Sequence, residues 1–210
     1  MGYPYPDGYY IPLNDPSIPP EELAKFFGFW ITGYYAHGDT PETLSTRHPL
    51  DEPSPTVARM SPEDLAPSLH DPPTLLDGPD TVILKCDITT GVLSRLREAA
   101  LFASHNAEVA WPDVEFRYVW CDHSAWVMPW GARTFRAEIE QARKDGKHIR
   151  ANSIVRMRGA NHCVSIPFTH IPVTPLISIV KVHWDEPEKA LKALLSDAQS
   201  DVHIREVAKF

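Results

Sequence analysis

The sequence predicts an α/β fold: a parallel sheet with flanking helices, preceded by a helical segment of different composition. From residue 80 onward, short β-branched runs alternate with helix-like runs, and such alternation is typical of a parallel sheet that is covered on both faces. Before residue 80 the chain carries most of its 21 prolines and no strand-like run. We therefore expect a cap-like segment over residues 1–79 and a sheet-containing core over residues 80–210.

The cap-like segment contains one strongly amphipathic helix. Pro19, Pro20, Glu21 and Glu22 suit a first helical turn, and Gly38 is a plausible end. Apolar residues then recur with a period of 3.6, which predicts one aromatic face: Leu23, Phe26, Phe27, Trp30, Ile31, Tyr34 and Tyr35. This face either packs in the core or serves as a lid over an apolar pocket. A second, short helix is expected to begin at the Ser61 cap.

Strands and helices alternate in the second part of the chain. Apolar, β-branched runs predict strands over residues 81–86, 114–121 and 149–157. Amphipathic runs predict helices over residues 92–103 and 132–145, and the latter carries Phe135, Ile139 and Ala142 on one face and ends at Gly146. A last helix is expected after Asp185, where acidic residues and a proline form a start signal.

Composition narrows the possible partners. A formal net charge of −8 argues against nucleic acid and anionic membranes as partners. No apolar run approaches the ~20 residues of a membrane span, and the N-terminus lacks the pattern of a signal peptide. The three cysteines are scattered, which favours reduced thiols. We expect a cytoplasmic protein without metal or cofactor, and the sequence makes no prediction of its oligomeric state.

Three polar residues follow the predicted strands: Asp87, Asp122 and His162. In parallel sheets, sites lie at the carboxyl ends of the strands, so loops after neighbouring strands can bring an acid and a histidine together. An imidazole accepts a proton near neutral pH, and a carboxylate orients it and stabilises the imidazolium. An acid followed by a histidine is also the order in which α/β-hydrolases carry these two groups.

Four segments together resemble the C-terminal half of fungal α/β-hydrolases, a superfamily of hydrolases and esterases with an inserted lid. They are Trp111–Val114, Val119–Trp126, Gly159–His162 and His183–Pro187. Each segment alone is weakly specific, and their order is moderately specific. The resemblance covers most of the chain, and it implies that residues 3–38 form part of the lid.

The resemblance implies roles for the site residues. His162 would be the catalytic base and Asp122 its acid partner, with Asp87 as the rival acid. Many members carry the acid slightly later in this loop, where this chain has Ser124. His123 and His183 are interpreted as structural or solvated, Asn161 as a turn residue, and Trp126 and Trp130 as packing residues.

The chain departs from the family pattern at two points. No Gly-x-Ser-x-Gly nucleophile elbow and no Gly-rich oxyanion segment occur in the 210 residues. In addition, residues 164–181 separate the Asn-His pair from the His-Trp-Asp segment, which in the family follows within a few residues. We interpret this run as a translated intron, because Val-Ser-Ile can be encoded by an intron donor sequence. The alternative is a genuine insertion beside the active site.

The sequence and the resemblance together imply two alternative functions. The first is the lid and C-terminal part of a hydrolase that cleaves an ester, amide or epoxide of a small apolar substrate, inactive without a nucleophile from elsewhere. The alternative is a non-catalytic binding or accessory protein of the same fold. A cysteine-based enzyme that uses Cys86 or Cys121 is a weaker option, because neither residue lies in a recognisable nucleophile turn.

Overall fold

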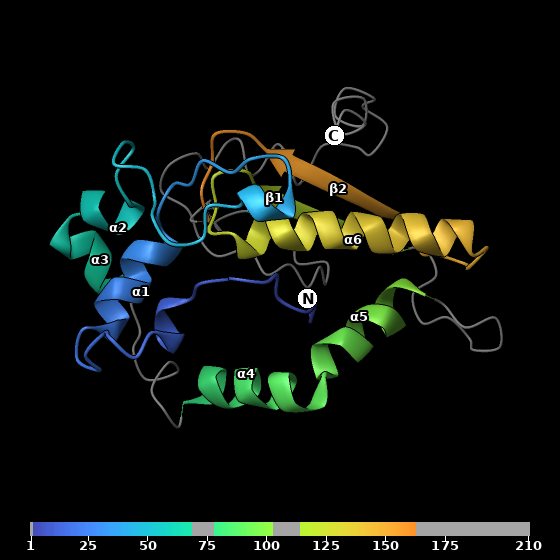
Figure 1. Cartoon of the computed structure of the whole chain (residues 1–210), viewed down its shortest axis with the longest axis horizontal. Helices are drawn as coiled ribbons and strands as arrows, with labels where there is room; N and C mark the ends of the chain where they lie inside the picture. The colour runs from blue at the N-terminus through green and yellow to red at the C-terminus, as the bar shows by residue number, and fades with distance from the viewer. Residues whose placement is uncertain (1, 69–77, 103–113, 163–210) are drawn as a thin grey trace. The chain divides into compact units, whose positions relative to one another are not determined.

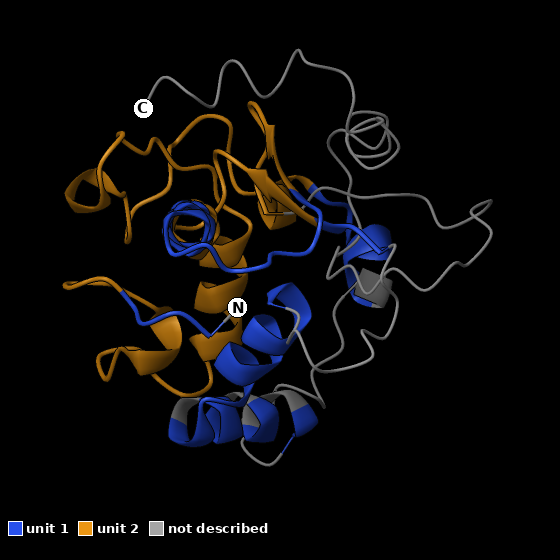
Figure 2. Ribbon diagram, turned by 90° about the vertical axis from the view of Figure 1, so that its right-hand side faces the viewer, with its two compact units in different colours: residues 1–5, 60–116, 133–152 blue, residues 6–59, 117–132, 153–210 orange. Residues whose placement is uncertain are grey.

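A computed structural model describes residues 2–68, 78–102 and 114–162 (Figure 1). The chain groups into two compact units, each built from separated stretches of sequence (Figure 2). Unit 1 comprises residues 1–5, 60–116 and 133–152, and unit 2 comprises residues 6–59, 117–132 and 153 onward. The predicted division between residues 79 and 80 stays a prediction. Residues 164–181 and the helix expected after Asp185 lie outside the described residues.

Two strands form a parallel pair, as the sequence predicts for this part of the chain. They are β1 (Phe116–Cys121) and β2 (Asn152–Met157), and helix α6 (Val127–Lys144) connects them. Later residues of β1 pair with later residues of β2: the Phe116 N–H donates to the Ala151 carbonyl at 2.7 Å, and the Asp122 N–H to the Met157 carbonyl at 3.1 Å. This strand–helix–strand unit places the ends of β1 and β2 at one edge.

Helix α6 buries the face that its sequence predicts. Phe135, Ile139 and Ala142 are all buried. The helix ends as expected at Gly146, whose φ of 68° is left-handed. The Gly146 N–H bonds the Arg143 carbonyl at 3.1 Å, and the Lys147 N–H bonds the Ala142 carbonyl at 2.9 Å, which together form a Schellman cap. Unlike the prediction, α6 begins at Val127 rather than near residue 132.

The expected strand over residues 81–86 is wrong, because this stretch belongs to helix α4 (Pro79–Thr90). Helix signals flank it: Pro79 occupies the first turn, and Gly91 ends the helix with a φ of 63°. Val82 and Ile83 are more than half exposed, unlike residues of a buried strand. Helix α5 (Val92–Leu101) follows, as predicted for residues 92–103, and buries Leu101 completely.

Unit 1 contains an ion pair between α5 and α6. Arg97 Nε lies 3.0 Å from Glu138 Oε2, and the Tyr3 hydroxyl donates to the same carboxylate. The Arg97 guanidinium also lies 4.0 Å from the centre of the Tyr3 ring, a cation–π distance. Elsewhere in the unit, helix α3 (Pro62–Ser68) has the predicted cap, because the Asp64 N–H donates to Ser61 Oγ at 3.2 Å.

The N-terminal part of unit 2 holds four short helices: η1 (Pro12–Asn14), α1 (Leu23–Ile31), η2 (Pro41–Thr43) and α2 (Thr56–Arg59). The aromatic helix is therefore shorter than expected, and the predicted end at Gly38 is wrong. Thr32 Oγ1 donates to the Gly28 carbonyl at 2.8 Å, and the helix stops there. Gly33 comes next, where a Cβ atom would approach Pro49 Cβ to 2.6 Å, so only glycine fits.

The aromatic face of α1 contributes to the core of unit 2, which confirms the packing interpretation. Trp30 and Tyr35 are buried in one cluster with Leu44, Ala125 and Trp126. Trp126 is fully buried, and its indole N–H donates to the Tyr10 carbonyl at 2.7 Å. Trp130 packs against the cluster. A lid role for α1 stays a prediction. In the described part of the chain, no helix combines the length and the apolar character needed to cross a membrane.

The buried Tyr35 and the half-buried Tyr118 predict a loss of stability at alkaline pH. Desolvation by burial is the largest cause that raises the pKa of Tyr35 and of Tyr118 well above 10. Their hydroxyls donate to the carbonyls of Trp30 at 2.8 Å and Met128 at 3.4 Å, and ionisation would remove both bonds. Because the unfolded phenols ionise near pH 10, the free energy of unfolding falls as the pH rises above about 10.

A spectrophotometric titration checks this expectation. We expect the phenolate absorbance of Tyr35 and Tyr118 to emerge only together with the loss of far-UV circular dichroism. Tyr35→Phe and Tyr118→Phe should each remove one late-ionising group. Ionisation of all seven tyrosines in a single phase near pH 10, with the circular dichroism unchanged, would contradict the burial of these two rings.

Candidate functional site

The predicted acid and the predicted base lie in the two segments that follow β1 and β2. Asp122 begins the turn after β1, and residues 158–162 form the segment after β2. The backbone joins the two segments beyond the strands, because the His123 N–H donates to the Ala160 carbonyl at 2.9 Å. On its other side, the His123 carbonyl accepts the Tyr35 N–H at 3.0 Å. The turn that carries Asp122 is thus held from both sides.

The Asp122 carboxylate contacts the β2 side through both oxygens. Its Oδ1 accepts the Gly159 N–H at 2.8 Å, and its Oδ2 accepts Arg156 Nε–H at 3.1 Å. The Asp122 side chain is only 10% exposed, so these bonds replace water that the charge has lost. Arg156 is not among the site residues that the sequence predicts. The sequence does carry a signal for Arg156: it stands near the end of one predicted strand, and an acid, Asp122, directly follows the strand before it.

Gly159 forms the turn between β2 and the histidine. Its φ of 72° is left-handed, a conformation that costs other residues about 1–2 kcal/mol. The turn directs the Gly159 N–H toward Asp122 Oδ1. The strand-ending turn therefore depends on a glycine in the middle of the Arg-Gly-Ala-Asn-His segment.

Asn161 is a buried cross-link rather than the turn residue that the sequence suggested. Its side chain is 1% exposed. The amide Nδ2 donates to the Thr32 carbonyl at 2.6 Å and to Thr56 Oγ1 at 2.8 Å. These bonds fix the residue just before His162 to the end of α1 and to α2. His162 itself is half-buried, and its pairing with Asp122 stays a prediction.

His123 and Ser124, which follow Asp122 in the turn, lie near Tyr34 and His37. His123 Nε2 lies 4.0 Å from Asp122 Oδ1, and its ring lies 6.3 Å from the Tyr34 ring. Ser124 is 1% exposed. Its carbonyl lies 2.7 Å from His37 Nε2. Because His37 Nδ1 accepts the Ser45 N–H, Nε2 must carry the proton and donate to Ser124.

Asp87 does not follow a strand, so the basis for treating it as the rival acid is wrong. It lies in the last turn of α4. Its Oδ1 accepts the Leu93 N–H in the first turn of α5 at 2.8 Å. The carboxylate thus satisfies a backbone donor at the start of a helix and favours that end electrostatically. Asp87 belongs to unit 1, whereas Asp122 and His162 belong to unit 2.

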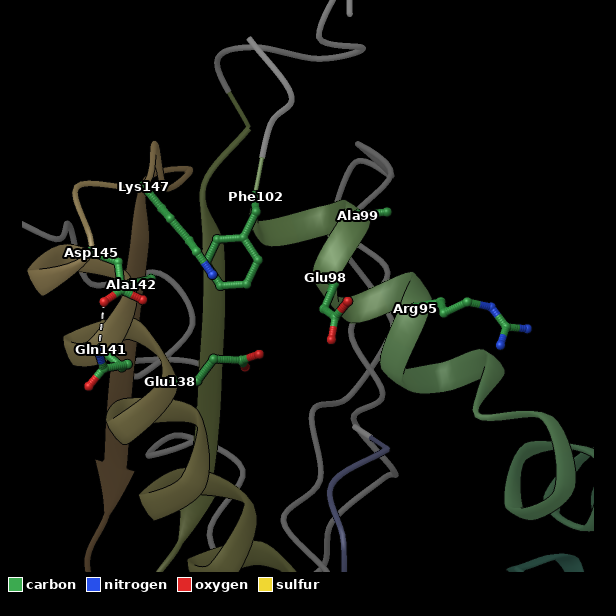
Figure 3. Close-up of a pocket in the computed structure, with 9 residues that line it drawn as sticks. All are labelled: Arg95, Glu98, Ala99, Phe102, Glu138, Gln141, Ala142, Asp145 and Lys147. Atoms are coloured by element: carbon green, nitrogen blue, oxygen red, sulfur yellow. Dashed lines mark hydrogen bonds between the residues drawn. The ribbon is translucent and has the colours of Figure 1, made fainter.

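A cavity of about 560 Å³ lies in unit 1. Figure 3 shows Glu98 of α5 and Glu138 of α6 beside the cavity, with Phe102 just after the end of α5 and Lys147 extending toward the Phe102 ring. Lys147 Nζ lies 5.8 Å from the centre of that ring. The chain continues from Phe102 into residues 103–113, which lie outside the described part. None of the residues predicted for catalysis lines this cavity.

The site is thus a carboxylate, an arginine and a glycine turn at the carboxyl ends of two parallel strands, with His162 three residues after the turn glycine. Within the described ranges, no group of three or more histidine, cysteine or acidic side chains is arranged to hold a metal ion. Comparisons with family models, with curated proteins and with solved structures find no match to this chain.

Proposed function

We propose that this chain supplies the general base and the acid of a hydrolase-type site. His162 acts as the base, and Asp122 orients its imidazole. The observation that carries the proposal is the 2.8 Å bond between the Gly159 N–H and Asp122 Oδ1, which joins the two segments that hold the acid and the histidine. The substrate class is a small apolar ester, amide or epoxide.

The chemistry requires a nucleophile that the 210 residues do not offer in a recognisable elbow. In the proposed site, His162 takes the proton of that nucleophile as it attacks, and later returns a proton to the leaving group. Asp122 stabilises the imidazolium between the two steps. The nucleophile would come from sequence outside these residues or from another chain. Phe26 and Phe29 of α1, both more than 40% exposed, offer an aromatic surface for an apolar substrate.

A non-catalytic binding or accessory role is the second candidate. The absence of a Gly-x-Ser-x-Gly segment from the 210 residues favours it, because a site with a base and an acid but no nucleophile cannot form a covalent intermediate. The same aromatic surface of α1 would then bind an apolar ligand without turnover. A cytoplasmic location is proposed for either role.

Sequencing the transcript and the genomic DNA around this reading frame separates the two candidates. The hydrolase proposal predicts an in-frame Gly-x-Ser-x-Gly segment upstream, joined to the present codons in one message. It also predicts that most messages lack the codons for residues 164–181, the suspected intron. A message without an upstream elbow would favour the binding role, and one that retains Cys163 joined to Val164 would refute the intron.

The activity of the complete product tests the roles of the two residues. We expect hydrolysis of p-nitrophenyl esters by the protein that includes the upstream elbow, and no turnover by the 210-residue chain alone. His162→Ala should lower kcat of the complete protein by roughly 10³-fold or more. His123→Ala is the matched control and should retain activity within about threefold, since hydrolysis does not use that imidazole. Clear turnover by the 210-residue chain, lost on His162→Ala, would refute the need for a further nucleophile.

A further inference from the structure

The Asp122 carboxylate has a fixed orientation because two donors hold it from different positions along β2 and its turn. Arg156 Nε–H bonds Oδ2 at 3.1 Å, and the Gly159 N–H bonds Oδ1 at 2.8 Å. A carboxylate offers about four acceptor positions, so one lone pair on each oxygen remains for a third donor. The carboxylate is therefore both immobilised and still able to accept a bond from an imidazole.

Arg156 is itself held in place. Its guanidinium carbon lies 5.5 Å from the centre of the Trp120 ring, and Trp120 is 8% exposed at the end of β1. Arg156 has 27% of its side chain exposed. A planar guanidinium that stacks on an indole and bonds a carboxylate loses few degrees of freedom on pairing. Arg156 thus connects β2 to the end of β1 and to the turn that follows β1.

We propose that Arg156 is a positioning residue: it orients Asp122 so that one oxygen holds the Gly159 turn and the carboxylate faces the segment that carries His162. The inference rests on the proposed function of Asp122 and His162. It assigns Arg156 a role that acts through Asp122 and not on the substrate. His123 Nε2, at 4.0 Å from Oδ1, is too distant for a hydrogen bond and does not replace the arginine.

Arg156→Met tests the proposal, because it keeps most of the side-chain length and removes the donor and the charge. The first readout is the exchange rate of the Gly159 amide proton, measured by NMR on the full chain. We expect exchange at least about tenfold faster, since a bond to a correctly oriented, charged acceptor is lost. Arg158→Met, at an exposed arginine of the same turn, is the matched control and should leave the rate within about twofold.

Arg156→Lys serves as the conservative variant. Lysine keeps the charge without the planar fork, so we expect an exchange rate between those of the unmodified chain and Arg156→Met. It also carries the test if the methionine variant does not fold. An unchanged Gly159 exchange rate in every folded Arg156 variant would overturn the proposal.

The second readout is the imidazole N–H proton of His162, which a bond to Asp122 shifts to low field. We expect Arg156→Met to weaken or abolish this resonance, an effect that a purely structural ion pair elsewhere would not produce. Its persistence at full intensity would overturn the positioning role. If the unmodified chain lacks the resonance while the Gly159 amide responds to Arg156, the proposed acid–base pair fails and the orientation of Asp122 by Arg156 stands.

Discussion

Replacing Trp126 by alanine is expected to lower the free energy of unfolding by about 3–5 kcal/mol. Trp126 is fully buried in the cluster that contains Trp30 and Tyr35, so its removal leaves a large cavity. Its indole N–H also holds the Tyr10 carbonyl at 2.7 Å, and the Tyr9 ring lies 5.6 Å away. The segment before α1 would lose one of its contacts within unit 2, beside those of Arg47 with Tyr10 and Asp15.

Urea denaturation followed by circular dichroism measures this loss. Trp126→Phe keeps an aromatic ring and most of the apolar volume but removes the N–H donor and part of the fused ring, and we expect a smaller loss of about 1–2 kcal/mol. Trp130→Ala, at a half-buried position on the edge of the same cluster, should cost less than Trp126→Ala. A loss below about 1 kcal/mol for Trp126→Ala would be incompatible with its central place in this core.

Replacing Asn161 by leucine has the second largest expected effect, a loss of about 2–4 kcal/mol. The amide donates two bonds from a site that is 1% exposed. Leucine removes both bonds: the Thr32 carbonyl keeps its bond from the Thr56 N–H at 3.0 Å, and the Thr56 hydroxyl loses the amide donor. Because Asn161 directly precedes His162, the same change should also displace the histidine from the end of β2.

A double-mutant cycle with Thr56→Val isolates the contact. If the Asn161 amide bonds the Thr56 hydroxyl as described, the two changes together should cost less than the sum of their separate effects. Asn14→Ala, at an exposed asparagine in η1, is the matched control and should stay within about 0.5 kcal/mol. Strict additivity of Asn161→Leu and Thr56→Val would argue against the cross-link.

Local sequence patterns predicted the strand–helix–strand unit well. β1, α6 and β2 each carry a period or a cap that needs no distant partner to be recognised, as the Gly146 cap illustrates. The predicted strand over residues 81–86 was wrong because a six-residue β-branched run does not distinguish a strand from a helix. There, Pro79 and the left-handed Gly91 bound a helix, and those two residues were the better guide.

Only part of the candidate site could be predicted from the sequence. Parallel strands end at one edge, which was enough to expect Asp122 beside the segment of His162. The contacts of Asn161 with Thr32 and Thr56 join residues more than 100 positions apart, and no local pattern encodes such a pair. The sequence near Arg156 shows only an arginine at the end of a strand. Its contact with Asp122 could not be predicted from that, because it depends on the register between β1 and β2.

The most direct test of the account is the imidazole N–H spectrum of His162 in the ¹⁵N-histidine-labelled chain at low temperature. We expect one low-field proton that His162→Gln removes, that His123→Gln leaves in place and that Asp122→Asn removes or shifts strongly upfield. These results would place the carboxylate of Asp122 on the imidazole of His162. A spectrum without such a proton, or one that Asp122→Asn leaves unchanged, would contradict the claim that the ends of β1 and β2 build an acid–base pair.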